Sequence, residues 1–287
     1  MTDYLLRAIT KDKHIRVHAV NARETVQTAV DLHYLSTTNS VIMGRLIICG
    51  LLMSVNLKNK TDLITLRIDG NGPVGSVVVT ATGDNTIKGY INNPQLELTK
   101  NAKGFAVAEA IGKGTLSVIK STANNQNYHS QIELVSSEIG EDLCHYYQQS
   151  EQIDTMVNLG IMLEKDAMIK NACGILVQCM PETPVYILET LNENIQVFPN
   201  LSDMVDMGYS LEQIIEQFIF KNMPIDFLEQ KSISYFCNCN KDRFLNGIRL
   251  LGKDEIQSLI DSDETITAEC HFCNKKYSFM KTDFENL

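Results

Sequence analysis

Four cysteines near the C-terminal end of the sequence are spaced like the ligands of a metal ion. Cys237 and Cys239 form a C-x-C pair, and Cys270 and Cys273 form a C-x-x-C pair after thirty intervening residues. Two close pairs brought together by a folded loop commonly enclose tetrahedral zinc. Because four thiolates leave no open coordination position, the pattern predicts a closed site for one zinc ion per chain rather than metal-assisted hydrolysis.

The residues around the second pair add detail and leave alternatives open. Residues 268–279 resemble a zinc knuckle, in which a tight turn between two short strands carries both thiolates. His271 could replace one thiolate, although four cysteines already complete a tetrahedral set. Lys275 and Lys276 could favour the thiolate form of the adjacent pair, but a solvated turn explains them equally well. An inert structural zinc site is the usual outcome for four clustered cysteines.

Zinc coordination would also prepare the site for redox chemistry. Zinc holds its ligand sulfurs as thiolates, which is the form that oxidants attack. Losing the metal removes roughly 10–16 kcal/mol of binding free energy, which in small zinc modules is also folding free energy. The segment that carries the cysteines, residues 233–287, is close to the lower size limit for independent folding. We therefore expect this small C-terminal zinc-binding redox domain to unfold when its zinc is lost.

The first 180 residues predict an N-terminal sheet-and-helix core domain of the α+β class. Residues 23–57 are largely compatible with a helix. Four segments have the pattern of antiparallel strands with one buried face, namely 63–68, 76–80, 115–119 and 131–135. Helices interleaved with such hairpins are typical of α+β layers.

Residues 181–232 predict a helical linker region between the core domain and the zinc domain. Ser210 begins a capping box that is completed by Gln213. A stripe of apolar residues at helical spacing follows and predicts a helix docked on a core: Leu211, Ile214, Ile215, Phe218 and Ile219. Isolated helices of this length are marginal in water, so the linker should loosen if its docking surface is withdrawn.

Composition excludes several classes of partner. The 287-residue chain has a formal net charge of -10, which disfavours nucleic acid as a partner and leaves only a local basic face open. The most apolar run, residues 46–55, is too short to span a membrane, and the N-terminus has no pattern of an export signal. We expect a soluble cytoplasmic protein, in which clustered cysteines are more often metal ligands than structural disulfides. The other cysteines are expected to be buried and inert: Cys49, Cys144, Cys173 and Cys179.

Two glycine-rich segments resemble nucleotide-binding motifs only formally. Residues 70–75 satisfy G-x-G-x-x-G, but the valines that follow prefer a strand, whereas a dinucleotide site needs a helix there. Residues 112–115 lack the upstream glycine of a P-loop and also precede strand-like residues. We interpret the first as a hairpin turn, and neither segment implies nucleotide binding. No arrangement typical of a catalytic triad or carboxylate pair is evident. The chain is therefore not expected to be an enzyme.

With these residues in place, the sequence resembles the redox-regulated 33 kDa heat-shock chaperone family over nearly its whole length. The resemblance rests on the cysteine pairs with their flanking residues and on further stretches upstream: 236–239, Arg243, 251–252 and 269–277, then 33–36, 44–45, 70–73, 89–90, 112–114, 141–143, 150–152 and 174–181. It implies a holdase chaperone that is zinc-bound and inactive at rest. Oxidative stress would form the disulfides Cys237–Cys239 and Cys270–Cys273, release zinc and unfold the linker. The activated homodimer would then bind unfolding clients without ATP.

Three functional hypotheses follow from the sequence. The first is the redox-activated holdase that the resemblance implies. The second is a constitutive protein-binding adaptor stabilised by structural zinc. The third is a thiol oxidoreductase that uses the C-x-x-C pair, and it is disfavoured because no thioredoxin-like βαβ context surrounds that pair.

Overall fold

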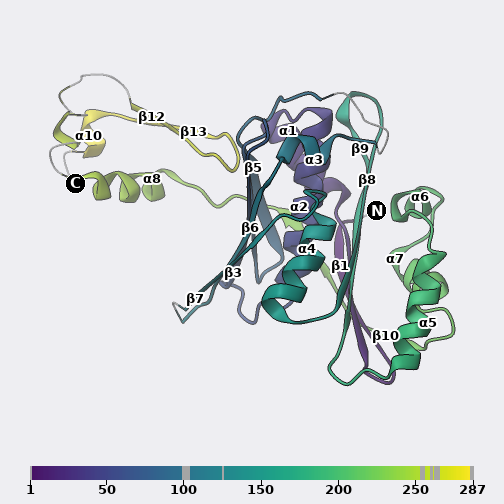
Figure 1. Cartoon of the computed structure of the whole chain (residues 1–287). Helices are drawn as coiled ribbons and strands as arrows, with labels where there is room; N and C mark the ends of the chain where they lie inside the picture. The colour runs from purple at the N-terminus through teal and green to yellow at the C-terminus, as the bar shows by residue number, and fades with distance from the viewer. Residues whose placement is uncertain are drawn as a thin grey trace. The chain divides into compact units, whose positions relative to one another are not determined.

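The structure, a computed structural model, describes residues 2–98, 104–124, 126–252, 256–258, 261 and 266–284. Its contacts divide the chain into two compact units, Met1–Tyr235 and Phe236–Leu287. Figure 1 shows both units, and each is described here by itself. Parts of the predicted domain 233–287 lie outside the described residues. The mixed helices and strands confirm the α+β class.

A five-stranded antiparallel sheet crosses the first unit. Its order is β10-β1-β2-β9-β8, and its strands are β1 (Tyr4–Thr10), β2 (Ile15–Asn21), β8 (Thr155–Leu163), β9 (Ile169–Cys179) and β10 (Ile225–Ser232). Strands β2 and β9 are buried on both faces, because cores form on each side of the sheet. The strand β10 was not anticipated, since residues 181–232 were expected to be helical.

A six-stranded sheet forms the other layer of the first unit. Its order is β11-β5-β4-β3-β6-β7, and its strands are β3 (Leu63–Gly70), β4 (Ser76–Thr82), β5 (Thr86–Ile91), β6 (Gly114–Ser121), β7 (Asn127–Glu133) and β11 (Ser234–Tyr235). Three of the predicted strands lie within β3, β4 and β6, and the fourth is shifted, because β7 ends at Glu133.

The glycine-rich segment 70–75 is a turn, as predicted, and strand β6 follows the segment that begins at Gly112. Residues 70–75 connect β3 to β4, whose register pairs Asp69 with Ser76 across the turn. The short helix α3 (Val107–Ile111) ends before Gly112, and β6 begins at Gly114, so no helix starts at this segment. A phosphate-binding helix N-terminus is therefore absent from both described segments.

The two sheets enclose a buried helix. The predicted helical stretch 23–57 is broken into α1 (Arg23–His33) and α2 (Thr37–Ser54), because Tyr34 adopts a left-handed conformation with φ 51° and Ser36 caps the second helix. Helix α2 is long and apolar enough to cross a membrane, but 89% of it is buried within the protein. Helix α2 lies between the two sheets (Figure 1), and its side chains belong to one continuous core with theirs. Its apolar character is therefore that of a core helix.

The linker helices cover the opposite face of the five-stranded sheet. They are α5 (Val185–Gln196), α6 (Leu201–Asp206) and α7 (Leu211–Ile214), which continues as a π-helical turn over Ile215–Ile219. The predicted capping box is present, because Ser210 Oγ accepts from the Gln213 N–H while the Gln213 side chain accepts from the Ser210 N–H. Four residues of the predicted stripe are buried and Phe218 is half-buried, so the stripe is docked on a core.

Shorter elements complete the two units. In the first unit, α4 (Gly140–Tyr146) continues as a π-helical turn over Tyr147–Glu151, and a 3-10 turn spans Lys165–Ala167. The described elements of the second unit are α8 (Lys241–Ile248), a 3-10 turn over Arg249–Leu251, the hairpin of β12 (Ile266–Glu269) and β13 (Lys276–Phe279), and α10 (Lys281–Phe284).

Candidate metal centre

Two different local structures present the four predicted ligands. Cys237 and Cys239 lie in an irregular segment that precedes α8. Cys270 and Cys273 lie in the turn between β12 and β13, where the Cys270 carbonyl accepts from the N–H groups of Cys273 and Asn274 at 3.2 and 2.7 Å. The Cys270 N–H donates to the Lys275 carbonyl at 3.0 Å. This strand-turn-strand arrangement is the predicted knuckle.

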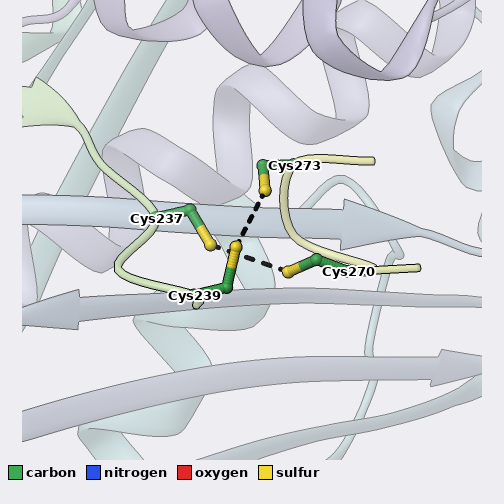
Figure 2. Close-up of side chains that lie close together, drawn as sticks. All are labelled: Cys237, Cys239, Cys270 and Cys273. Atoms are coloured by element: carbon green, nitrogen blue, oxygen red, sulfur yellow. Dashed lines mark hydrogen bonds between the residues drawn. The ribbon is translucent and has the colours of Figure 1, made fainter. Parts of the chain in front are cut away.

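The four sulfurs converge on one point, as Figure 2 shows. All of them lie within 4.8 Å of one another. The Sγ atoms of Cys237 and Cys270 are 3.7 Å apart, and those of Cys239 and Cys273 are 3.4 Å apart. A tetrahedral ion with Zn–S bonds of about 2.3 Å holds its sulfurs roughly 3.8 Å apart. The donor set and its spacing therefore fit a closed, four-coordinate metal ion.

The chemistry of the donors agrees with that fit. All eight cysteines are free of disulfide bonds, so the four sulfurs of the cluster are available as ligands. Cys270 is buried, and the other three ligands are half-buried. Among the described residues, the group that could hold a metal consists of these four cysteines, and His271 is not part of it. Soft sulfur ligands in a tetrahedral set select zinc or related ions rather than magnesium or calcium.

A tyrosine from β13 contacts the cluster. Tyr277 Oη lies 3.1 Å from Cys239 Sγ and 2.9 Å from the Cys239 carbonyl oxygen. Burial works to raise the pKa of Cys239, but hydrogen bonds from Tyr277 and the neighbouring sulfurs outweigh it and lower that pKa to about 7. Burial, together with hydrogen bonds to the other sulfurs, raises the pKa of Cys273. Of the cluster sulfurs, that of Cys239 is thus favoured as a thiolate.

Further contacts hold the segment of the first pair in place. Arg243 donates to the Asn238 side chain at 2.7 Å, and Asn240 caps α8 by accepting from the Arg243 N–H at 2.8 Å. The rings of Phe244 and Tyr277 lie 5.0 Å apart, so α8 packs on β13. These contacts place the two cysteine pairs on elements that support each other.

The two lysines after the second pair face different surroundings. Lys275 Nζ lies 5.3 Å from the centre of the Tyr277 ring. Lys276 forms an ion pair of 3.7 Å with Glu269, and both side chains are largely exposed. Exposed pairs of this kind contribute little to stability. Neither contact is a hydrogen bond to a cluster sulfur.

Comparison with known proteins identifies the family of this fold and site. A family model described as "Hsp33 protein" matches residues 3–280. The chain belongs to the Hsp33 family. A protein of Clostridium perfringens named 33 kDa chaperonin is 37% identical over 291 residues, which cover 100% of this chain and 92% of that protein. A Geobacillus protein with the same name is 34% identical, with 100% of this chain and 97% of that protein covered.

A solved structure supports the assignment. The crystal structure of a 33 kDa chaperonin (heat shock protein 33 homolog) from Thermotoga maritima matches with a TM-score of 0.91 at 32% identity, covering 100% of this chain and 97% of that one. The predicted resemblance is therefore confirmed. Membership of the Hsp33 family supports a chaperone role, which involves binding client proteins, and the relatives bear the name of chaperonins rather than of enzymes.

The remaining cysteines of this Hsp33-family chain lie in the first unit, outside the cluster. Cys49 and Cys173 are buried, and Cys144 and Cys179 are half-buried. Burial raises the pKa of all four thiols, that of Cys173 to about 12. Because the thiolate is the reactive form, these residues are held in the unreactive one. The sequence did not reveal the role of Tyr277, whose only signal was its place in the knuckle motif.

Proposed function

We propose that this chain is a redox-regulated, ATP-independent holdase of the cytoplasm. At rest, Cys237, Cys239, Cys270 and Cys273 would bind one zinc ion and the chain would be inactive. Under oxidative stress it would bind unfolding proteins and prevent their aggregation. The observation that carries the proposal is the cluster of four free thiols within 4.8 Å of one another, in a chain of a chaperone family.

At rest, the cluster would act as the stabilising centre of the second unit. Zinc bound there would supply a tetrahedral cross-link and keep the ligand sulfurs as thiolates. Among the described residues of this unit, only Cys270 and Phe279 are buried. Apolar burial on that scale cannot offset the conformational entropy of some fifty residues. The unit therefore depends on the four sulfurs staying reduced.

Oxidation would remove the ligands in pairs. Two thiols lose two electrons and two protons to a peroxide, which is reduced to two water molecules, and a disulfide forms. The resemblance to the family favours the pairs Cys237–Cys239 and Cys270–Cys273. Sulfur distances within reach of disulfide formation also join the two pairs, at 3.7 Å for Cys237 to Cys270 and 3.4 Å for Cys239 to Cys273. Mapping the disulfides by peptide mass spectrometry distinguishes the two pairings.

Unfolding would then spread to the linker, residues 181–232. Its helices are short, so they hold their place only through packing on the five-stranded sheet, and the linker ends four residues before the second unit begins at Phe236. Their detachment would expose their own apolar residues together with the sheet face that they cover, which includes Leu6, Val17, Ala19, Ile175 and Val177. A surface of this kind binds the apolar segments of unfolding proteins. It also gives the oxidised chain a surface for dimerisation.

A combined assay of zinc release and light scattering tests the proposal. The purified reduced chain should retain one zinc, and peroxide with mild heat should release it while the chain begins to suppress aggregation of a thermally unfolding enzyme. The Cys144→Ser variant is the matched control, because it removes a half-buried thiol outside the cluster and should respond like the natural chain.

Other outcomes would favour the alternative functions. Zinc release without any effect on aggregation would contradict the chaperone mechanism. Retention of zinc throughout oxidation would contradict the switch and favour the zinc-stabilised adaptor. Catalytic turnover of insulin disulfides would instead indicate a thiol oxidoreductase.

A further inference from the structure

The edge of the five-stranded sheet is formed by a strand of the linker. Strand β10 pairs with β1 along the whole of that strand, from Tyr4 opposite Ser232 to Thr10 opposite Ile225. Strand β1 pairs with β2 on its other side. Removing β10 would therefore turn β1 from an inner strand into the edge strand of the sheet.

The hydrogen bonds at the two ends of β1 show which of its peptide groups face β10. The Asp3 carbonyl accepts from the Ile233 N–H at 3.5 Å, and the Lys11 N–H donates to the Pro224 carbonyl at 2.9 Å. Peptide groups alternate in direction along a strand, so those of Leu5, Arg7 and Ile9 also face β10. Those of Leu6 and Ala8 face β2, on the same side as the Thr10 carbonyl that accepts from the Lys13 N–H.

Strand β10 has the properties of a protective edge. None of its residues is buried, and Leu228 is 57% exposed. The register shifts so that Arg7 opposes Glu229 and Ala8 opposes Phe227, which leaves Leu228 as an unpaired bulge. Charged residues also lie along it, at Asp226, Glu229 and Lys231. Bulges and charges are the devices by which natural edge strands avoid pairing with other chains.

Strand β1 has the opposite properties. Leu5 packs into the core around α2, whereas Leu6 and Ala8 pack into the core beneath the linker helices. Its register with β2 is continuous, and Arg7 is its single charged residue. A strand with continuous register and apolar residues on both faces pairs readily with an added strand once its edge is free.

We infer that β1 is the client-binding edge of the activated chain, and that an extended apolar segment of an unfolding protein takes the place of β10. This inference rests on the proposed function, because β10 belongs to the linker and ends four residues before the second unit begins at Phe236. Main-chain hydrogen bonds to the freed groups of Leu5, Arg7 and Ile9 would hold the segment. These bonds form with any sequence, while the apolar faces of β1 favour alternating apolar side chains.

A client segment fits this edge better than β10 of a second copy does. Strand β10 from another chain would bring the same bulge at Leu228 and the same exposed side chains, so exchange would add no new pairing. A client without a bulge could complete every hydrogen bond along β1. The client is therefore the preferred occupant on grounds of pairing.

Residue-resolved amide hydrogen exchange of the full chain tests the inference. The probe is reduced, carboxymethylated α-lactalbumin, which stays unfolded. Activation by peroxide should lower the protection of the Leu5, Arg7 and Ile9 amides by roughly 100-fold, since they lose their partner strand. Adding the probe should restore that protection. The amides of Leu6 and Ala8 should stay protected throughout, and those of β8, the opposite edge of the sheet, should not respond to the probe.

Three results would overturn the inference, and each is distinct from failure of the proposed function. The three amides could remain protected after activation, which would mean that β10 stays in place. They could remain unprotected while the probe is bound and aggregation is suppressed, which would place the client elsewhere. They could regain protection without the probe as chain concentration rises, which would identify a second copy as the occupant. Loss of aggregation suppression itself would contradict the proposed function instead.

Discussion

The two units of this chain are stabilised by different means. The first unit, Met1–Tyr235, buries two apolar clusters, one around α2 and one beneath the linker helices. The second unit, Phe236–Leu287, buries only Cys270 and Phe279 among its described residues. Apolar burial stabilises a fold without any ligand, whereas the stabilisation that a thiol cluster provides depends on bound metal and on the redox state of the sulfurs. The chain thus combines a core around α2 that needs no ligand with a conditional core in the second unit, which would depend on its metal.

The difference would explain why the proposed switch lies in the smaller unit. Oxidants reach and modify thiolates, but they do not alter buried aliphatic side chains. The four cysteines of the first unit are held as thiols by burial, so the same oxidant should not modify that unit directly. Direct sensitivity to oxidants should therefore be confined to the second unit, in which few of the described residues are buried.

Metal removal should produce the largest effect. Treating the reduced, zinc-loaded chain with a strong chelator should unfold the second unit, because roughly 10–16 kcal/mol of binding free energy is lost. The core around α2 should keep its secondary structure, whereas the linker, residues 181–232, should loosen. Circular dichroism and limited proteolysis measure the two outcomes separately. A second unit that stays resistant to protease without metal would mean that its apolar contacts suffice, and the contrast between the units would be wrong.

A smaller effect is expected at the last residue of the first unit. Tyr235 Oη donates to the Gly89 carbonyl at 2.9 Å, accepts from the Gly89 N–H at 3.1 Å and lies 3.3 Å from His33 Nε2. Tyr235→Phe leaves both buried backbone groups of Gly89 unpaired, at a cost of about 1–3 kcal/mol for each. In the reduced, zinc-bound chain, amide exchange over residues 225–235 should become faster.

The control for that variant is another tyrosine of the same sheet. Tyr128 is 56% exposed, and its hydroxyl contacts the exposed side chain of Gln126. Tyr128→Phe should leave exchange over residues 225–235 unchanged. If both variants behave alike, Tyr235 does not hold the linker strand, and the unfolding of the second unit reaches β10 by another route.

The sequence predicted the convergence of the four cysteines well because its signal is local. Two cysteine pairs at ligand spacing need only be brought together, and the knuckle turn could be recognised from the residues around Cys270 and Cys273. The capping box at Ser210 and the apolar stripe, which recurs at helical spacing, were also local patterns. Features of this kind can be predicted from sequence because no distant contact is needed to define them.

The features that escaped prediction depend on distant contacts or on single backbone angles. Strand β10 was missed because the bulge at Leu228 interrupts the alternation by which strands are recognised, and only pairing with β1 defines it. The break between α1 and α2 rests on the left-handed conformation of Tyr34, a residue type that gives no signal for it. The contact of Tyr277 with Cys239 requires the register of β12 and β13, which spacing alone does not fix.

The smallest expected effect concerns that last contact. Tyr277→Phe keeps the ring that packs on Phe244 but removes the hydroxyl 3.1 Å from Cys239 Sγ. Groups that hydrogen-bond to metal ligands typically account for about 10–100-fold in metal affinity. Zinc should therefore bind about 10-fold more weakly to the variant, as measured by competition with a chelating dye at fixed pH.

Lys276→Ala is the matched control for Tyr277→Phe, because it changes the neighbouring residue of the same strand and removes only an exposed ion pair with Glu269. Its zinc affinity should equal that of the natural chain. Equal affinities in both variants would show that the four sulfurs hold the metal without help from the hydroxyl. If only Tyr277→Phe loses zinc affinity, the conditional core of the second unit includes Tyr277 as well as the four cysteines, because the tyrosine hydroxyl orients Cys239.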